Sequence, residues 1–209
     1  DLYINPLTGL PRFFEDKGYA GVDLVATLSE VMGNSEGVDY GLLLDPWIGF
    51  LKAAGCDTVP RIAMAAAQLG EESGGLRWME EIADGSEYEG RTDLGNTQPG
   101  DGKRFKGRGP IQLTGRYNYG KFSQWAYANG YCPTATYYVD HPAEVSKYDV
   151  GFLAAAWYWT THNLNVAADN MDVIAATKII NGGDHGLQDR QFRYSRAMQM
   201  GDRLLAFLD

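Results

Sequence analysis

The sequence predicts a mainly α-helical domain with at most a small β element. Three observations support this fold class: apolar residues recur at helical spacing, capping residues precede these segments, and the loop-like stretch rich in Gly, Asp and Asn is confined to residues 84–109. With 209 residues, 44% of them apolar, the chain can fill a sizeable core, so we expect one domain over residues 1–209.

Three helices are expected before the loop. Each combines a capping residue, apolar residues on one face and a glycine stop. Pro46 and Pro60 fit the first turns of the second and third helices, where a missing backbone N–H costs nothing. The expected caps and stops are, in order, Asp23 and Gly33, Asp45 and Gly55, and Thr58 and Gly74.

Four further helices are expected after the loop. The second is rich in alanine and tryptophan, so it should be deeply packed. The third is capped by Asn170 and ended by the run from Asn181 to Gly183. The expected ranges are about 115–128, 149–161, 171–180 and 187–207.

The composition disfavours several classes of partner. A net charge of −9 argues against nucleic acid and anionic membranes, whose binding needs clustered Lys and Arg. No run reaches the roughly 18 consecutive apolar residues of a membrane span. The N-terminus does not resemble a signal peptide and begins at Asp1, so we expect the chain to come from a longer polypeptide. A neutral or weakly charged polysaccharide fits better, and a monomer is the expected state.

Metal and disulfide chemistry are not expected. The three histidines, His141, His162 and His185, form no metal-binding spacing, so neither a metal nor another cofactor is predicted. Cys56 and Cys132 could pair, but a core of this size needs no disulfide. Free, partly buried thiols are therefore expected.

Two neighbouring glutamates near the end of the third helix should differ in environment. At about 100° per residue, Glu71 falls opposite the apolar stripe and should be solvated, whereas Glu72 falls at its rim. Partial burial raises the pKa of a carboxyl group and keeps it protonated near neutrality, as a general acid requires. Glu72 is therefore the candidate acid.

A matching general base must be a second carboxylate that stays ionised across a cleft from the acid. Glu81 is the candidate, because it follows a double glycine and a short amphipathic segment that could carry the chain to the far wall. On position alone, Glu80, Glu87 and Glu89 are nearly as good. A single acidic residue is, moreover, more often a surface charge than a catalyst.

Four ordered pieces of sequence extend from about residue 62 to residue 194. They are GEESGG at 70–75 with Glu80-Glu81 after it, GRGPIQLT at 107–114, YNYG at 117–120, and INGG at 180–183 with Gln188-Asp189-Arg190 after it. Together they resemble glycoside hydrolase family 19, which contains chitinases and many bacteriophage endolysins. The resemblance implies a lysozyme-like, two-lobed helical fold with a central substrate cleft. It lies within residues 56–209, whereas residues 1–55 carry no recognised motif.

The resemblance also implies roles for individual residues. Glu72 matches the general acid, and Glu81 matches the general base of members with a short intervening loop. Thr114 matches the hydroxyl residue that helps to hold the attacking water, and Arg190 matches an arginine beside the acid. Positions that bind acetamido sugars are matched by Gln112, Tyr117, Asn118 and Asn181.

Two positions in these motifs have less defined roles. Arg108 fits a structural ion pair and a cleft contact equally well. The family usually has histidine where this chain has Glu71. Because Glu71 should point away from the apolar stripe, little loss of catalysis is expected from this difference.

The resemblance further implies an inverting hydrolysis, with the two carboxyl groups roughly 6.5 to 9.5 Å apart to admit water. Segments 78–81 and 88–102 look like the endolysin branch and lack the cysteines typical of plant chitinases. This favours peptidoglycan, cleaved between N-acetylmuramic acid and N-acetylglucosamine, by an enzyme made in the host cytoplasm that acts at the bacterial wall during phage lysis. Chitinase is the main alternative. A lytic transglycosylase and an inactive wall-binding module are less favoured.

Overall fold

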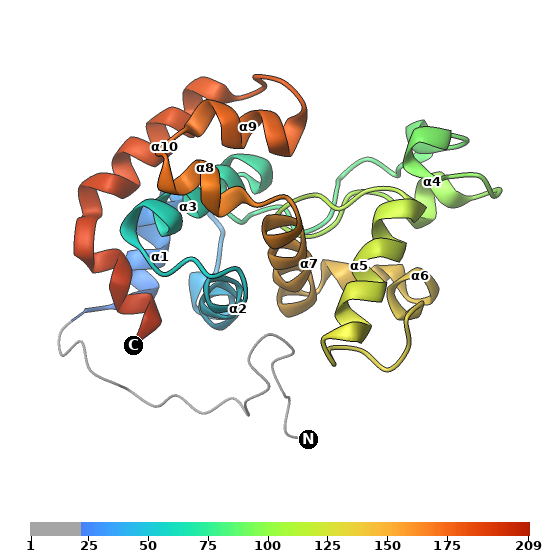
Figure 1. Cartoon of the computed structure of the whole chain (residues 1–209), viewed down its shortest axis with the longest axis horizontal. Coiled ribbons are helices and arrows are strands. Elements are labelled where there is room, and N and C mark those ends of the chain that lie inside the picture. Colours follow the sequence, from blue (N-terminus) through green and yellow to red (C-terminus); the bar gives the residue numbers. More distant parts are fainter. Residues whose placement is uncertain (1–21) are drawn as a thin grey trace.

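The computed structural model describes residues 22–209, and helices carry nearly all of the regular structure there. Figure 1 shows two lobes on either side of a central helix, α7 (Tyr148–Thr161). The large lobe holds α1 (Leu24–Met32), α2 (Tyr40–Ala53), α3 (Val59–Ser73), α8 (Leu164–Asp169), α9 (Val173–Asn181) and α10 (Leu187–Met200). The small lobe holds α4 (Asp101–Arg104), α5 (Arg116–Ala128) and α6 (Tyr137–Asp140). The predicted mainly α, two-lobed fold class is confirmed.

Short elements complete the described chain. Short 3₁₀ helices lie in the small lobe and after α10; their bounds are Ser86–Tyr88, Thr92–Leu94, Pro142–Ser146 and Gly201–Leu208. Between residues 22 and 209, β structure is limited to two isolated antiparallel bridges, Glu80 with Arg108 and Arg108 with Leu113. The expectation of at most a small β element is therefore confirmed.

The predicted caps of α1 and α3 are present. Asp23 accepts a hydrogen bond from the Ala26 amide at 3.0 Å, and α1 ends at Gly33, whose φ is 96°. Thr58 accepts from the Arg61 amide at 3.4 Å and caps α3. Such caps depend only on neighbours in the sequence, so they can be predicted without knowledge of the fold.

The predicted start of α2 is wrong. The helix begins at Tyr40, where Asp39 accepts from the Gly41 amide at 3.0 Å, and Pro46 lies inside the helix. An interior proline costs a helix about 3 kcal/mol. Leu43 and Leu44 are buried before the proline, and the burial of these side chains offsets that cost.

Boundaries in the last third also differ from the prediction. Asp172, and not Asn170, caps α9, since its carboxylate accepts from the Ala175 amide at 2.9 Å. Asn170 instead ends α8, a six-residue helix that is too short to show a clear apolar period. The chain leaves α-helical geometry at Gly201, whose φ is 59°, and continues as 3₁₀ helix to Leu208.

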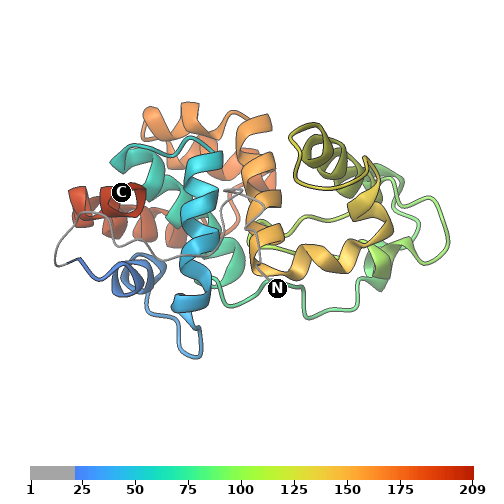
Figure 2. The same cartoon turned by 90° about the horizontal axis from the view of Figure 1, so that it is seen from below.

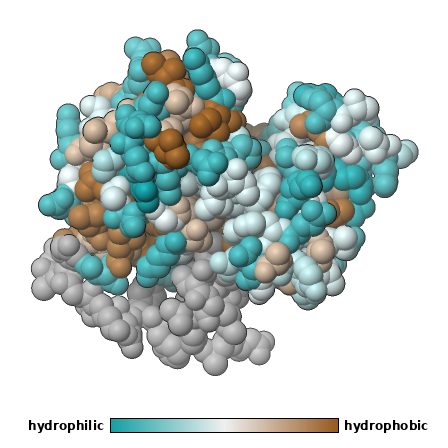
Figure 3. Space-filling model, in the orientation of Figure 1, coloured by the Kyte–Doolittle hydropathy of each residue, from teal (hydrophilic) through white to brown (hydrophobic). Residues whose placement is uncertain are grey.

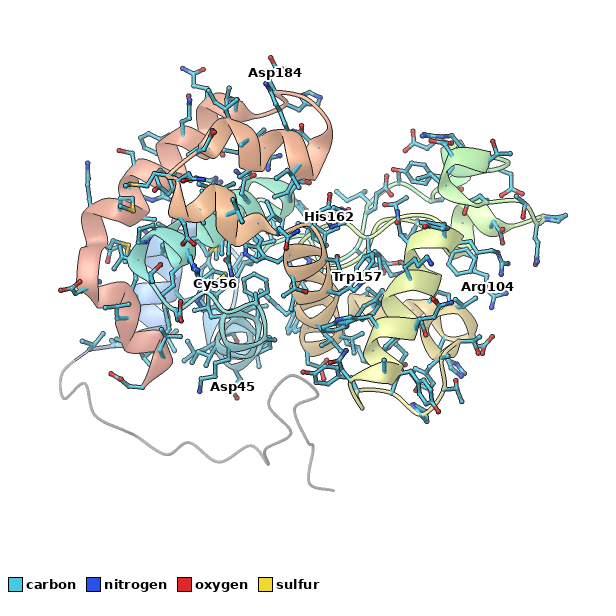
Figure 4. The ribbon with its side chains drawn as sticks, viewed as in Figure 1. Asp45, Cys56, Arg104, Trp157, His162 and Asp184 are labelled. Carbon is cyan, nitrogen blue, oxygen red and sulfur yellow. The ribbon has the colours of Figure 1, made fainter. Side chains whose placement is uncertain are left out.

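The central helix packs against both lobes. Figure 2 shows α2 and α7 running side by side, and their rings interlock: the Phe50 centroid lies 6.2 Å from Phe152 and 5.9 Å from Trp159. Trp157 lies on the side of α7 that faces the small lobe, 6.1 Å from the Phe122 ring of α5 (Figure 4). The alanine- and tryptophan-rich helix is thus as deeply packed as the sequence predicts.

A glycine pair joins the small lobe to α7. A Cβ atom built on Gly151 of α7 would lie 3.0 Å from the Gly109 Cα and 2.9 Å from Met79 Cε. Gly109 belongs to the GRGPIQLT segment and has a φ of 76°. This close backbone approach fixes the segment against the central helix, and a side chain on either glycine would separate the two.

Replacing Gly151 by Ala is expected to destabilise the protein by about 1–3 kcal/mol, the usual cost of overpacking. The matched control is Gly120→Ala in α5, because a Cβ there meets nothing closer than 3.9 Å. Chemical denaturation of both variants measures the difference. Equal stability of the two variants would contradict the close packing of α7 on the GRGPIQLT segment.

Other predicted features can be compared with the described residues. Both cysteines are free, Cys56 buried and Cys132 partly buried, so they do not pair. No helix within residues 22–209 combines the length and apolar character needed to cross a membrane. In the same range, no cluster of three or more His, Cys, Asp and Glu side chains is arranged to hold a metal ion.

Candidate active site

The candidate acid lies in the last turn of α3. The space-filling view shows a hollow between the two lobes (Figure 3). The Glu72 side chain is 18% exposed, so the expectation of partial burial at the rim of the apolar stripe is confirmed. Its carboxylate forms an ion pair with Arg190 of α10. The predicted arginine beside the acid is therefore present in the structure.

Arg190 is fixed by more than its ion pair with Glu72. The guanidinium is 3% exposed, donates to Gln68 Oε1 at 2.6 Å and donates to the His185 carbonyl at 3.1 Å. Gln68 in turn donates to Thr177 Oγ1 at 3.3 Å, which links the network to α9. A buried charge with every donor group engaged holds its partner in one orientation, so Glu72 cannot turn freely.

The candidate base lies on a short backbone ladder between the lobes. The Glu81 amide donates to the Gly107 carbonyl at 2.9 Å, and the Gly109 amide donates to the Met79 carbonyl at 2.8 Å. These bonds pair residues 79–81 with residues 107–109 in antiparallel fashion. The double glycine after α3 permits the turn that carries the chain to this ladder.

Two donors hold the Glu81 carboxylate. The Tyr88 hydroxyl donates to Oε1 at 2.9 Å, and the Gly107 amide donates to Oε2 at 3.1 Å. Burial and the hydrogen bond to Glu81 raise the pKa of Tyr88 above its usual range, so the phenol keeps the proton that it donates. Glu81 is thus an oriented, hydrogen-bonded carboxylate.

Thr114 and Gln112 converge with Glu81 around Gly107. A Cβ atom on Gly107 would lie 2.7 Å from Gln112 Oε1, 3.2 Å from Glu81 Oε2 and 3.4 Å from Thr114 Oγ1. The Thr114 hydroxyl donates to the Gln112 carbonyl at 2.9 Å, so its oxygen can still accept a hydrogen bond from a water molecule. Glycine at position 107 keeps the space among these three groups open.

The remaining predicted residues lie in different settings. Asn118 contacts the backbone of a site residue, because its Nδ2 donates to the Thr114 carbonyl at 2.9 Å. Tyr117 is 58% exposed. Asn181 uses its amide within its own loop, donating to the His185 carbonyl at 2.8 Å. Asn118 therefore positions the backbone of a site residue, while the Tyr117 ring is available to solvent.

Arg108 forms the structural ion pair. Its side chain is 8% exposed, contacts Glu80 at 3.3 Å and donates to the Tyr119 hydroxyl at 3.0 Å. The Glu80 carboxylate also contacts Lys106 at 3.1 Å, so it is held by two cations. The charge of Glu80 is therefore neutralised by Arg108 and Lys106. Glu81 instead accepts from the Tyr88 hydroxyl and the Gly107 amide.

The prediction for Glu71 is wrong. Glu71 is partly buried, because Gly186, just before α10, lies against its carboxyl group; burial and then the neighbouring Asp189 raise the pKa of Glu71 to about 7. The helical wheel describes one helix in isolation and contains no information on such a polar neighbour.

Three residues of the site were missed in the sequence. Gln68 lies one helical turn before Glu72, a spacing that could have identified it. Tyr88 approaches Glu81 through the irregular loop, and no local pattern predicts that contact. Tyr158 of α7 donates to the Ile179 carbonyl at 2.8 Å, and burial followed by the negative charge of Glu72 raises the pKa of this phenol.

Comparison with other proteins places this geometry in a family. Residues 49–187 match the family model described as chitinase class I of glycoside hydrolase family 19. A glycosyl hydrolase family 19 domain-containing protein of Haemophilus influenzae is 28% identical over 183 residues, which cover 73% of this chain and 85% of the relative. An endochitinase of Arabidopsis thaliana is 36% identical over 124 residues, 59% of this chain but only 39% of the plant protein.

Solved structures show the same fold. Chitinase C from Streptomyces griseus is similar with a TM-score of 0.61 and 22% identity, over 92% of this chain and 80% of that one. A bacterial family 19 chitinase has a TM-score of 0.56 and 23% identity, over 86% of this chain and 93% of that one. Because the family model covers well over half of the sequence, the chain belongs to glycoside hydrolase family 19 and is a chitinase-like glycoside hydrolase.

Proposed function

We propose that Glu72 is the general acid and Glu81 the general base of an inverting hydrolysis of a β-1,4 glycan containing N-acetylglucosamine. The observation that supports this assignment is the separation of the two carboxylates into networks without a common partner. Glu72 is held by Arg190 of the large lobe, and Glu81 by Tyr88 and Gly107 of the small-lobe segment. Two carboxyl groups in different surroundings can take different roles in one reaction.

In the proposed reaction, the Glu72 carboxyl donates its proton to the glycosidic oxygen as the bond from that oxygen to C1 breaks. A water molecule attacks C1 from the opposite face and transfers a proton to Glu81. The Thr114 hydroxyl, near the Glu81 carboxylate, accepts a hydrogen bond from this water and orients it. The new reducing end therefore has the inverted configuration, and proton exchange with solvent restores both carboxyl groups.

For the substrate we propose peptidoglycan, cleaved between N-acetylmuramic acid and N-acetylglucosamine. Segments 78–81 and 88–102 support this choice through their likeness to the endolysin branch. In this proposal the chain acts as a monomer on the bacterial wall during phage lysis, after synthesis in the host cytoplasm. Chitin is the second candidate, because the plant relatives are named endochitinases.

Mass spectrometry of the products separates the two substrates. Purified peptidoglycan and soluble N-acetylglucosamine oligomers are digested in parallel, with Glu72→Gln as the inactive control. New reducing ends on N-acetylmuramic acid are the expected result. Products from the oligomers alone would replace peptidoglycan with chitin, and products from neither polymer would contradict the proposed function.

Replacing Tyr88 by Phe is expected to lower kcat about tenfold with little change in KM. The variant loses a hydrogen bond to a charged group, which contributes about 1.5–3 kcal/mol, while the substrate contacts remain. The control is Tyr127→Phe, since Tyr127 is 51% exposed on α5. Steady-state kinetics measure both variants, and an equal kcat for the two would show that Tyr88 does not position Glu81.

A further inference from the structure

Lys106 has an ammonium group that the proposed reaction does not use. The residue immediately precedes Gly107, and its side chain is 17% exposed. Its Nζ atom contacts three acceptors within residues 80–83: the Glu80 carboxylate at 3.1 Å, the Glu81 carbonyl at 3.0 Å and the Ala83 carbonyl at 3.4 Å. A protonated lysine has three N–H donors, so these acceptors can use all of them.

The three acceptors lie on a segment without helical structure. The backbone ladder with residues 107–109 reaches Glu81, and the next residue, Ile82, is 79% exposed. The chain beyond the ladder bends around the Lys106 ammonium, which binds carbonyl oxygens on both sides of Ile82. This contact fixes the piece of backbone from which the Glu81 side chain projects.

Two consecutive residues, Lys106 and Gly107, thus contact both the backbone and the side chain of the candidate base. Gly107 accepts from the Glu81 amide at 2.9 Å and donates to Glu81 Oε2 at 3.1 Å, while Lys106 donates to the Glu81 carbonyl. The Glu81 carboxylate and its backbone are therefore both placed relative to one strand. A shift of that backbone would also move the carboxylate relative to Thr114.

The small lobe holds Lys106 itself in place. The buried Tyr119 hydroxyl donates to the Lys106 carbonyl at 2.8 Å and accepts from Arg108 Nη1 at 3.0 Å. A Cβ atom on Gly85, which has a φ of 82°, would lie 2.7 Å from the Lys106 Cβ, so the loop after residue 83 packs against the lysine stem. Lys106 therefore has a fixed backbone and a confined side chain, as a residue that positions a neighbour requires.

We propose that Lys106 is a positioning residue for the base: its ammonium group holds the backbone of residues 80–83 so that the Glu81 carboxylate faces the attacking water beside Thr114. Lys106 acts through Glu81 and not on the substrate. Because a displacement of about 1 Å in an active site can cost about 10²-fold in rate, loss of this contact should appear in kcat. The inference rests on the proposed function of Glu81 as the general base.

Lys106→Met removes the ammonium group and keeps an unbranched apolar stem. We expect kcat to fall about 10- to 100-fold, with KM and the affinity for an N-acetylglucosamine oligomer within about twofold of the wild type. The matched control is Lys103→Met, because Lys103 is 66% exposed and pairs with Asp84 at 2.9 Å on the surface. It removes the same charge from the small lobe and should change kcat less than about twofold. An equal loss in both variants would overturn the proposal in favour of an effect of net charge.

A double-mutant cycle with Glu81→Gln tests whether Lys106 acts through the base. Once Glu81 is replaced, Lys106→Met should change the residual kcat less than about twofold, because there is no carboxylate left to position. If the two losses multiply, Lys106 acts independently of Glu81 and the proposal is overturned. Circular dichroism, and rates measured below the melting temperature of every variant, exclude a loss of folded protein. If Lys106→Met does not fold, Lys106→Gln, whose shorter side chain retains amide donors, takes its place under the same criterion.

The outcomes separate this inference from the proposed function. If the wild type hydrolyses neither peptidoglycan nor the oligomers, the proposed function fails, and the inference fails with it. If the wild type is active and Glu81→Gln retains full turnover, the assignment of the base fails. If Glu81→Gln loses its activity while Lys106→Met matches the wild type, the positioning role of Lys106 alone is overturned.

Discussion

Glu72→Gln is expected to lower kcat about 10²–10⁴-fold, the usual contribution of a general acid. The amide keeps an oxygen that can accept from Arg190, so the orientation of residue 72 is largely preserved. It has no proton that it can transfer to the glycosidic oxygen. The loss should therefore appear in kcat and not in the affinity for a saccharide oligomer.

Two measurements on Glu72→Gln separate catalysis from folding. Isothermal titration with an N-acetylglucosamine oligomer should show binding close to that of the wild type, and circular dichroism should show the same helical content. Some loss of stability is expected, because Arg190 is 3% exposed and loses its anionic partner. A variant that retains wild-type turnover would remove Glu72 from the mechanism.

Glu81→Gln is expected to lower kcat by a similar factor of about 10²–10⁴, because the variant has no carboxylate to accept the proton of the attacking water. The amide also places a donor against the Tyr88 hydroxyl or the Gly107 amide, both of which donate to Glu81 in the wild type. The variant therefore loses the base, and the position at which the attacking water binds is also disturbed.

The matched control for Glu81→Gln is Glu87→Gln. Glu87 lies in the same loop and is exposed, and it carries the same charge as Glu81. Its replacement should change kcat less than about twofold, in line with the small effects of surface substitutions. Steady-state kinetics on the same polymer compare the two variants, and an equal loss in both would reveal a general effect of charge in the loop.

The sequence predicted those parts of the site that depend on a single element. The caps Asp23 and Thr58 satisfy backbone groups within one turn, and the helical phase correctly gave Glu72 a half-buried setting. Predictions from the local sequence were wrong where packing determines a helix boundary or the environment of a side chain. The start of α2 is set by leucines buried ahead of Pro46, and the environment of Glu71 is set by Gly186, just before α10.

The second half of the site depends on long-range pairing. Glu81 gains its donors only when residues 79–81 pair with residues 107–109, and that ladder brings Gly107 and Thr114 to it. Nothing in the spacing of Glu80, Glu81, Glu87 and Glu89 specifies this pairing. The family resemblance selected Glu81, which lies near Thr114 in the structure, and the contact of Tyr88 with Glu81 became visible only in the folded chain.

The anomeric configuration of the first product tests the paired-carboxylate mechanism most directly. Proton NMR is recorded during the first turnovers on a β-1,4 substrate, before mutarotation equilibrates the anomers. An inverting reaction by Glu72 and Glu81 predicts the α-anomer at the new reducing end. The β-anomer, or an anhydro sugar without a reducing end as a lytic transglycosylase would release, would contradict it.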